Sequence, residues 1–115
     1  MKVYLEKVKT DNFMYGMVPD LTQGNATIVD SFEISEEEGL ALDRLFVDQT
    51  NAVCDASLDL GDYQYYNSAQ CADLYNWLEE ATSDESISIL NDFFLKLKVY
   101  LQYAIDNNTG IAIEL

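Results

Sequence analysis

The sequence contains no histidine, only two cysteines, a single proline and six lysine or arginine residues. A Ser-His-Asp or Cys-His catalytic pair needs an imidazole as its base, so the absence of histidine excludes both arrangements. Two cysteines without histidine also fall short of the four nitrogen or sulfur ligands of a structural zinc site. We therefore predict a protein that is not an enzyme and has no metal site.

Positive charge is scarce. The chain has 21 aspartate and glutamate residues against the six basic ones, which gives a formal net charge of −15. A field of this sign repels nucleic acid and anionic membranes and attracts basic proteins. The sequence has neither the basic stripe of a nucleic-acid-binding domain nor a glycine-rich phosphate loop. We expect no nucleic-acid partner, no membrane partner and no cofactor, and the simplest alternative is that the acid serves solubility alone.

Long apolar runs are missing too. No stretch approaches the roughly 20 apolar residues of a membrane span. Residues 1–13 carry Lys2, Lys7 and Lys9 without a continuous apolar segment, unlike a secretory signal. These features predict a cytoplasmic protein, in which Cys54 and Cys71 are free, buried thiols.

Aromatic residues, by contrast, are plentiful, with eight tyrosines, five phenylalanines and one tryptophan, and 49% of the chain is hydrophobic. Disordered acidic chains lack aromatic residues, so this chain should fold despite its charge. A length of 115 residues fits one globular domain, residues 1–115.

Strand and helix patterns both occur. Residues 2–8, 26–34 and 111–115 show the β-branched content or the alternation of strands, and residues 12–18 form a further candidate strand. Capping boxes predict helices that begin at Ser35, Asn67 and Thr82. The last and longest helix carries an apolar stripe at helical spacing, and we expect its members to be core residues: Leu90, Phe93, Phe94, Leu97, Leu101 and Ala104.

Residues 53–66 alternate between apolar and polar residues and then become rich in tyrosine. Cys54, Leu58 and neighbouring apolar residues alternate with aspartates, which predicts a half-buried strand, and Gly61-Asp62 can turn the chain into a second one. Gly110 is expected to end the last helix in a left-handed conformation. Together these patterns predict an α+β fold: a small, mostly antiparallel sheet including both terminal strands and a central hairpin, packed against about three helices.

Tyrosine and carboxylate side chains concentrate on the predicted hairpin. Tyrosine gives a large contact area at low entropic cost, and carboxylates speed the approach of a basic partner. The residues from Asp55 onward do not match an EF-hand calcium loop. That loop needs glycine at its sixth position and an acidic residue at its twelfth, where this sequence has Leu60 and Tyr66. The candidate partner-binding residues are Asp55, Asp59, Asp62, Tyr63, Tyr65 and Tyr66, together with Glu36 and Glu37 at the start of the first helix.

Each candidate also has a purely structural interpretation. The tyrosines can simply cover an edge of the core, and acidic residues in a first helical turn are favoured by the helix dipole. For Glu36 and Glu37 the structural interpretation is the stronger of the two.

The C-terminal half, through "LDLGDYQYYN", "LYNWLEE" and "YAIDNNTGIAIEL", resembles small bacterial proteins of toxin-immunity loci over about half of the chain. Immunity proteins of polymorphic-toxin and contact-dependent inhibition systems are commonly small, acidic α+β proteins. The resemblance implies a protein that binds a cognate toxin domain, often a nuclease, and blocks its active site. It implies no catalytic residues.

We therefore expect an immunity protein that neutralises a basic, nuclease-type toxin by protein–protein binding, since nuclease sites carry lysine and arginine for phosphate. One alternative is an acidic nucleic-acid mimic from a phage or mobile element, of the anti-restriction or anti-CRISPR type. Another is a minor enzyme or regulatory domain that uses carboxylates alone.

Overall fold

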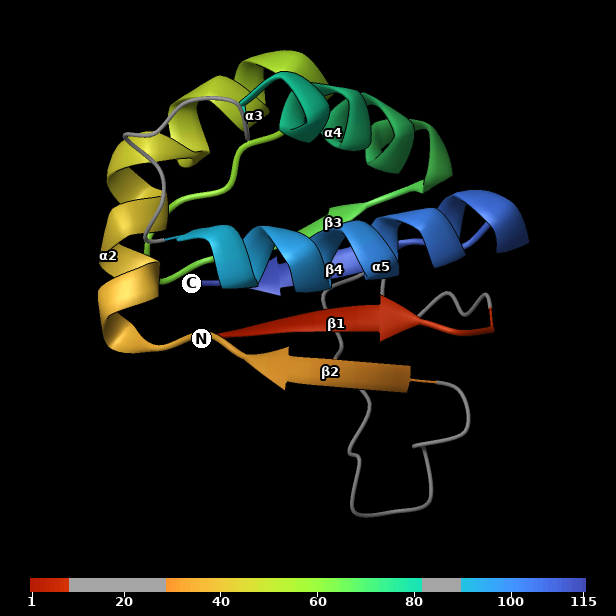
Figure 1. Ribbon diagram of the computed structural model, residues 1–115, viewed down its shortest axis with the longest axis horizontal. Coiled ribbons are helices and arrows are strands. Elements are labelled where there is room, and N and C mark those ends of the chain that lie inside the picture. The colour runs from red at the N-terminus through yellow and green to blue at the C-terminus, as the bar shows by residue number, and fades with distance from the viewer. Residues whose placement is uncertain (9–28, 82–89) are drawn as a thin grey trace.

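The computed structural model describes residues 1–8, 29–81 and 90–115 (Figure 1). The candidate strand at residues 12–18 and the capping box at Thr82 lie outside these residues, as do positions 26–28 of the second predicted strand.

A four-stranded antiparallel sheet forms one layer of the molecule. Its strands are β1 (Lys2–Glu6), β2 (Val29–Glu33), β3 (Tyr63–Tyr66) and β4 (Ile111–Glu114), in the spatial order β2-β1-β4-β3. The two terminal strands are thus the two central ones, and Lys2 lies directly opposite Glu114. The sequence predicted a sheet that contains both terminal strands.

The helices form the second layer (Figure 1). Within the described residues they are α2 (Glu36–Leu45), α3 (Val47–Cys54), α4 (Ser68–Ala81) and α5 (Asn91–Asn107). Two predicted capping boxes are present. In the first, Ser35 Oγ accepts from the Glu38 N–H at 3.1 Å and Glu38 Oε1 accepts from the Ser35 N–H at 3.0 Å. In the second, the side-chain oxygens of Asn67 and Gln70 each accept from the backbone N–H of the other residue at 2.9 Å.

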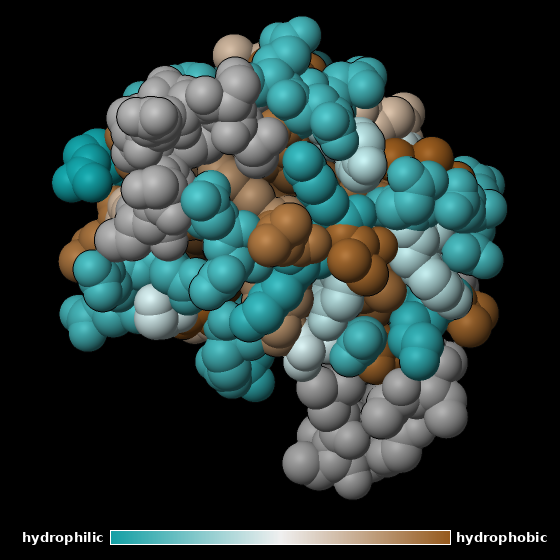
Figure 2. All heavy atoms as spheres, viewed as in Figure 1, coloured by the Kyte–Doolittle hydropathy of each residue, from teal (hydrophilic) through white to brown (hydrophobic). Residues whose placement is uncertain are grey.

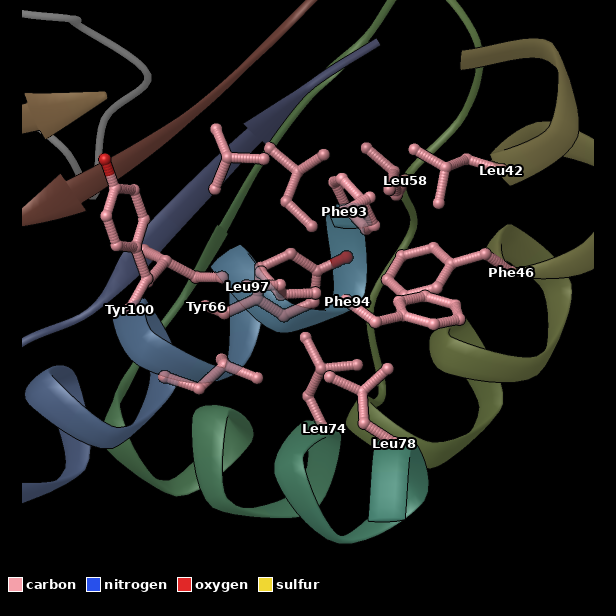
Figure 3. Packing of buried hydrophobic residues seen from close by; sticks show 14 of the residues in the cluster. Leu42, Phe46, Leu58, Tyr66, Leu74, Leu78, Phe93, Phe94, Leu97 and Tyr100 are labelled. Atoms are coloured by element: carbon pink, nitrogen blue, oxygen red, sulfur yellow. The ribbon is translucent and has the colours of Figure 1, made fainter. Parts of the chain in front are cut away.

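The core fills the space between the two layers (Figure 3). Every member of the predicted α5 stripe is buried, which confirms that stripe as core. Phe93 and Phe94 pack against Phe46 from the end of α2, with ring centroids 6.0 and 6.2 Å away. On the opposite helix surface, Leu95 and Val99 are 66% and 68% exposed, and Figure 2 shows apolar surface over α5 on this face.

The predicted hairpin is wrong in its first half. Val53 and Cys54 close helix α3, and the chain then runs without regular structure from Asp55 to the start of β3, which pairs with β4. Two side-chain bonds explain this path: Asn51 Nδ2 donates to the Leu58 carbonyl at 2.8 Å, and Asn51 Oδ1 accepts from the Leu58 N–H at 2.9 Å. An asparagine side chain thus gives Leu58 the two bonds that a partner strand would have supplied.

The end of α5 also differs from the prediction. Asn108, with φ of 55°, takes the left-handed position that we assigned to Gly110. Glycine is needed at 110 for another reason, because a Cβ there would collide with the Tyr66 carbonyl oxygen and the Tyr65 ring.

Both cysteines are free and buried, as predicted, although Cys54 lies at the end of a helix rather than on a strand. Burial raises the pKa of the Cys54 thiol to about 11, with a further contribution from the charge of Asp73, and it raises the pKa of Cys71 to about 12. No helix in the described part of the chain is long and apolar enough to cross a membrane.

Candidate functional site

Several carboxylates meet at one end of the sheet. The antiparallel register places Glu33, Lys2, Glu114 and Tyr63 in one row across the four strands. At this end β2 leads directly into α2, and the loop before β3 arrives here, because the Leu115 N–H donates to the Asp62 carbonyl at 3.0 Å. We call the following group the acidic end: Glu33, Glu36, Glu37, Asp59, Asp62 and Glu114.

The first turn of α2 supplies two members of the acidic end. Glu36 and Glu37 are exposed, whereas the carboxylate of Glu38 is committed to the capping box with Ser35. The structure therefore separates one structural glutamate from two that remain accessible to a partner.

The loop before β3 supplies two more. Asp59 Oδ1 accepts from the Leu60 N–H, and Asp62 Oδ1 accepts from the Tyr63 N–H, both at 2.8 Å. Each carboxylate uses one oxygen to shape the loop, yet both residues are exposed. The bond from Tyr63 also gives a backbone donor of the edge strand a partner, a common way of protecting sheet edges.

Two residues that the sequence analysis did not single out position this loop. Asn51 holds both backbone groups of Leu58, and Gln64 Oε1 accepts from the Ser57 N–H at 3.3 Å. Neither residue stands in a recognisable motif, because the bonds form between segments whose relative placement only the fold determines.

Asp55 lies apart from the acidic end. It is exposed, but it caps the C-terminus of α3 in a left-handed conformation with φ of 52°, and its N–H donates to the Asn51 carbonyl. Asp55 and Asp59 do not share a strand face, because residues 55–59 do not form the strand that the alternation predicted.

Tyr63 and Tyr65 share one face of the sheet, and it is the face opposite the helices. There they pack half-buried against Tyr4, Val29 and Ala112. The Tyr65 hydroxyl donates to Glu6 Oε1 at 2.9 Å. Burial is the main cause that raises the pKa of both tyrosines, and for Tyr65 the bond to Glu6 adds to it.

Tyr66 is not a surface residue. It is 0% exposed and points into the core, where Figure 3 shows it among side chains of α4 and α5. Successive strand residues point to opposite faces, so the neighbour of Tyr65 must enter the core. The assignment of Tyr66 to a partner-binding surface is therefore corrected.

The acidic end presents negatively charged carboxylates next to the half-buried tyrosines of strand β3. Within the described residues no three potential ligands are grouped to hold a metal ion. From β2 to β3 the acidic end spans three strand spacings, about 14 Å, which is the dimension of a protein contact rather than of a small-molecule pocket. Comparison with known protein families, curated proteins and solved structures finds no family model, protein or structure that matches this chain.

Proposed function

We propose that this protein is a cytoplasmic inhibitor that acts by binding, an immunity protein whose acidic end docks on a basic, nuclease-type toxin domain. The observation that supports this proposal is the convergence of separate chain segments at one end of the sheet. The strand ends, the start of α2 and the loop before β3 all bring carboxylates there.

Charge balance at the acidic end favours a basic partner. Within the described residues, the basic side chain in this row is Lys2, and it forms an ion pair with Glu33 at 3.3 Å. Carboxylates around a contact accelerate association with a positively charged protein. A toxin that binds nucleic acid must itself present lysine and arginine to phosphates, so its active site suits this surface.

The experiment begins with capture of the cognate partner on the immobilised protein and an activity assay of that partner with and without the inhibitor. Association and dissociation rates are then measured for Glu37→Gln, Asp59→Asn and Asp62→Asn at low and high salt. We expect each substitution to slow association, with smaller differences from the parent at high salt, because exposed charges are screened beyond about 10 Å at 0.1 M salt.

Asp55→Asn is the matched control. It removes the same charge from an exposed position four residues before Asp59, and asparagine also accepts the left-handed conformation. If the control slows association as much as Asp59→Asn, the effect belongs to net charge and the acidic end is not the docking surface. A captured partner that is a restriction or CRISPR nuclease would favour the nucleic-acid-mimic alternative.

A further inference from the structure

A groove of about 230 Å³ lies between α3 and α4. Among the described residues, its lining is Val53 from α3 and Asp73, Asn76, Trp77 and Glu80 from α4. Ligand pockets for whole small molecules usually measure about 300–1,000 Å³. This groove is smaller, which suits one side chain rather than a complete ligand.

The α4 residues of the groove form one stripe. Asp73 and Trp77 are four residues apart and Trp77 and Glu80 three, so all of them face the same side of the helix. With a rise of 1.5 Å per residue, the Cα atoms of Asp73 and Glu80 stand about 6 Å and about 4.5 Å along the axis from that of Trp77. The indole is thus flanked by one carboxylate on the preceding turn and one on the following turn.

Packing fixes the position of Trp77. Its ring lies nearly perpendicular to the rings of Phe46 and Phe94, with centroid distances of 5.6 and 6.4 Å, and part of Trp77 stays exposed. On the other wall Val53 is 42% exposed. The neighbouring Glu79 points elsewhere, to an ion pair with Lys98 at 3.5 Å.

We propose that this groove binds an arginine side chain of a basic protein. A guanidinium can stack on an indole face while its planar fork of N–H donors reaches carboxylates at its edges, a combination that the compact lysine ammonium cannot match. The side-chain carbonyl of Asn76 provides a neutral acceptor beside them. This inference goes beyond the proposed function, because the groove is built from α3 and α4 rather than from the acidic end.

The test is a titration with the peptide acetyl-Gly-Arg-Gly-amide, compared with the same peptide carrying neutral citrulline or lysine. Trp77 is the only tryptophan of the chain, so its fluorescence reports on the groove alone. We expect a saturable change with arginine, a weaker one with lysine and none with citrulline. Two-dimensional NMR should place the shifted signals on the Trp77 indole N–H and the Val53 methyl groups.

Asp73→Asn should weaken arginine binding by about 1.4- to five-fold, the factor that corresponds to about 0.2–1 kcal/mol for an exposed ion pair. Asp106→Asn, at an exposed carboxylate near the end of α5, is the charge-matched control and should leave peptide binding unchanged. An equal response to arginine and citrulline, or peptide binding that Asp73→Asn leaves intact, would overturn the groove assignment and leave the acidic end untouched.

Discussion

At the scale of single residues, Tyr66 carries an unusual polar group. Its hydroxyl is buried in the core and has no hydrogen-bond partner among the described residues. A buried unsatisfied hydroxyl costs about 1–3 kcal/mol relative to a paired one. The tyrosine is therefore present at this position in spite of its oxygen, and its ring provides the packing.

Replacing Tyr66 with phenylalanine removes only that oxygen. We expect Tyr66→Phe to raise the free energy of unfolding by about 1 kcal/mol, measured by urea denaturation, because the ring packing stays and the desolvation penalty disappears. Partner binding should not change. A clear loss of stability in Tyr66→Phe would show that the hydroxyl is hydrogen-bonded in solution.

The two buried thiols, Cys54 and Cys71, make the free energy of unfolding decrease with rising pH in the alkaline range. Folding raises their pKa to about 11 for Cys54 and about 12 for Cys71, above the usual value of about 8.5 for an exposed thiol. A raised thiol pKa means that the folded state holds the proton more tightly than the unfolded state. This contribution to stability is complete below about pH 8.5 and is lost as the pH rises toward 12.

We therefore expect the free energy of unfolding to fall above about pH 9, by up to about 1.4 kcal/mol per pH unit for each thiol. Denaturation at a series of pH values tests this, with Cys71→Ala as the comparison. That variant starts less stable, but its slope with pH should be shallower. Parallel slopes for parent and variant would mean that the pKa of Cys71 is the same in the folded and unfolded states.

At the scale of secondary-structure elements, the two surfaces of α5 have opposite roles. Phe94 is 1% exposed and contacts the Trp77 ring, whereas its neighbour Leu95 is 66% exposed. We expect Phe94→Ala to lower the free energy of unfolding by about 3–5 kcal/mol. Leu95→Ala is the matched control on the same helical turn and should cost less than about 0.5 kcal/mol. Similar losses in both variants would contradict the assigned helix face.

The loop that carries Asp59 and Asp62 depends on α3 through one side chain. Removing the Asn51 amide in Asn51→Ala leaves both backbone groups of Leu58 without their partner. We expect a loss of about 1–3 kcal/mol and faster amide hydrogen exchange at Leu58. Asn76→Ala, at an exposed asparagine of α4, is the control for the change of residue type. An unchanged rate of amide exchange at Leu58 would show that the loop keeps its conformation without the Asn51 side chain.

Local signals predicted the elements whose boundaries depend on nearby residues. Ser35 with Glu38 and Asn67 with Gln70 set two helix starts, and the stripe through Phe94 set one core face. Period-two alternation over residues 53–60 failed, since a helix end that buries Cys54 and a loop that buries Leu58 give the same pattern as a strand. The placement of Glu36 and Asp62 at the same end of the sheet could not be predicted, because it depends on strand order.

At the scale of the whole molecule, the net charge of −15 opposes the compact state. We expect sodium chloride added up to about 0.2 M to raise the melting temperature, because screening weakens the self-repulsion. The ion pairs of Lys2 with Glu33 and of Lys98 with Glu79 are at the surface and lose little on screening.

The same repulsion links stability to function. Asp59→Asn and Asp62→Asn should each raise the melting temperature at low salt while slowing association with the partner, because asparagine keeps the acceptor oxygen of the loop bond and removes one negative charge. Scanning calorimetry at two salt concentrations measures the first effect. A melting temperature that falls with added salt would indicate that attractive charge pairs outweigh the repulsion.

The central position of both terminal strands governs when the sheet can form. Lys2–Leu5 pair with residues 111–114, so more than 100 residues separate the partners. Ribosomes add about 5–20 residues per second, and the first strand therefore waits about 5–20 s for its central neighbour. Pairings this distant along the chain also close slowly. The central pairing of the sheet can therefore form only once residues 111–114 have been made, and until then the apolar side chains of Val3 and Leu5 lack β4 as a neighbour.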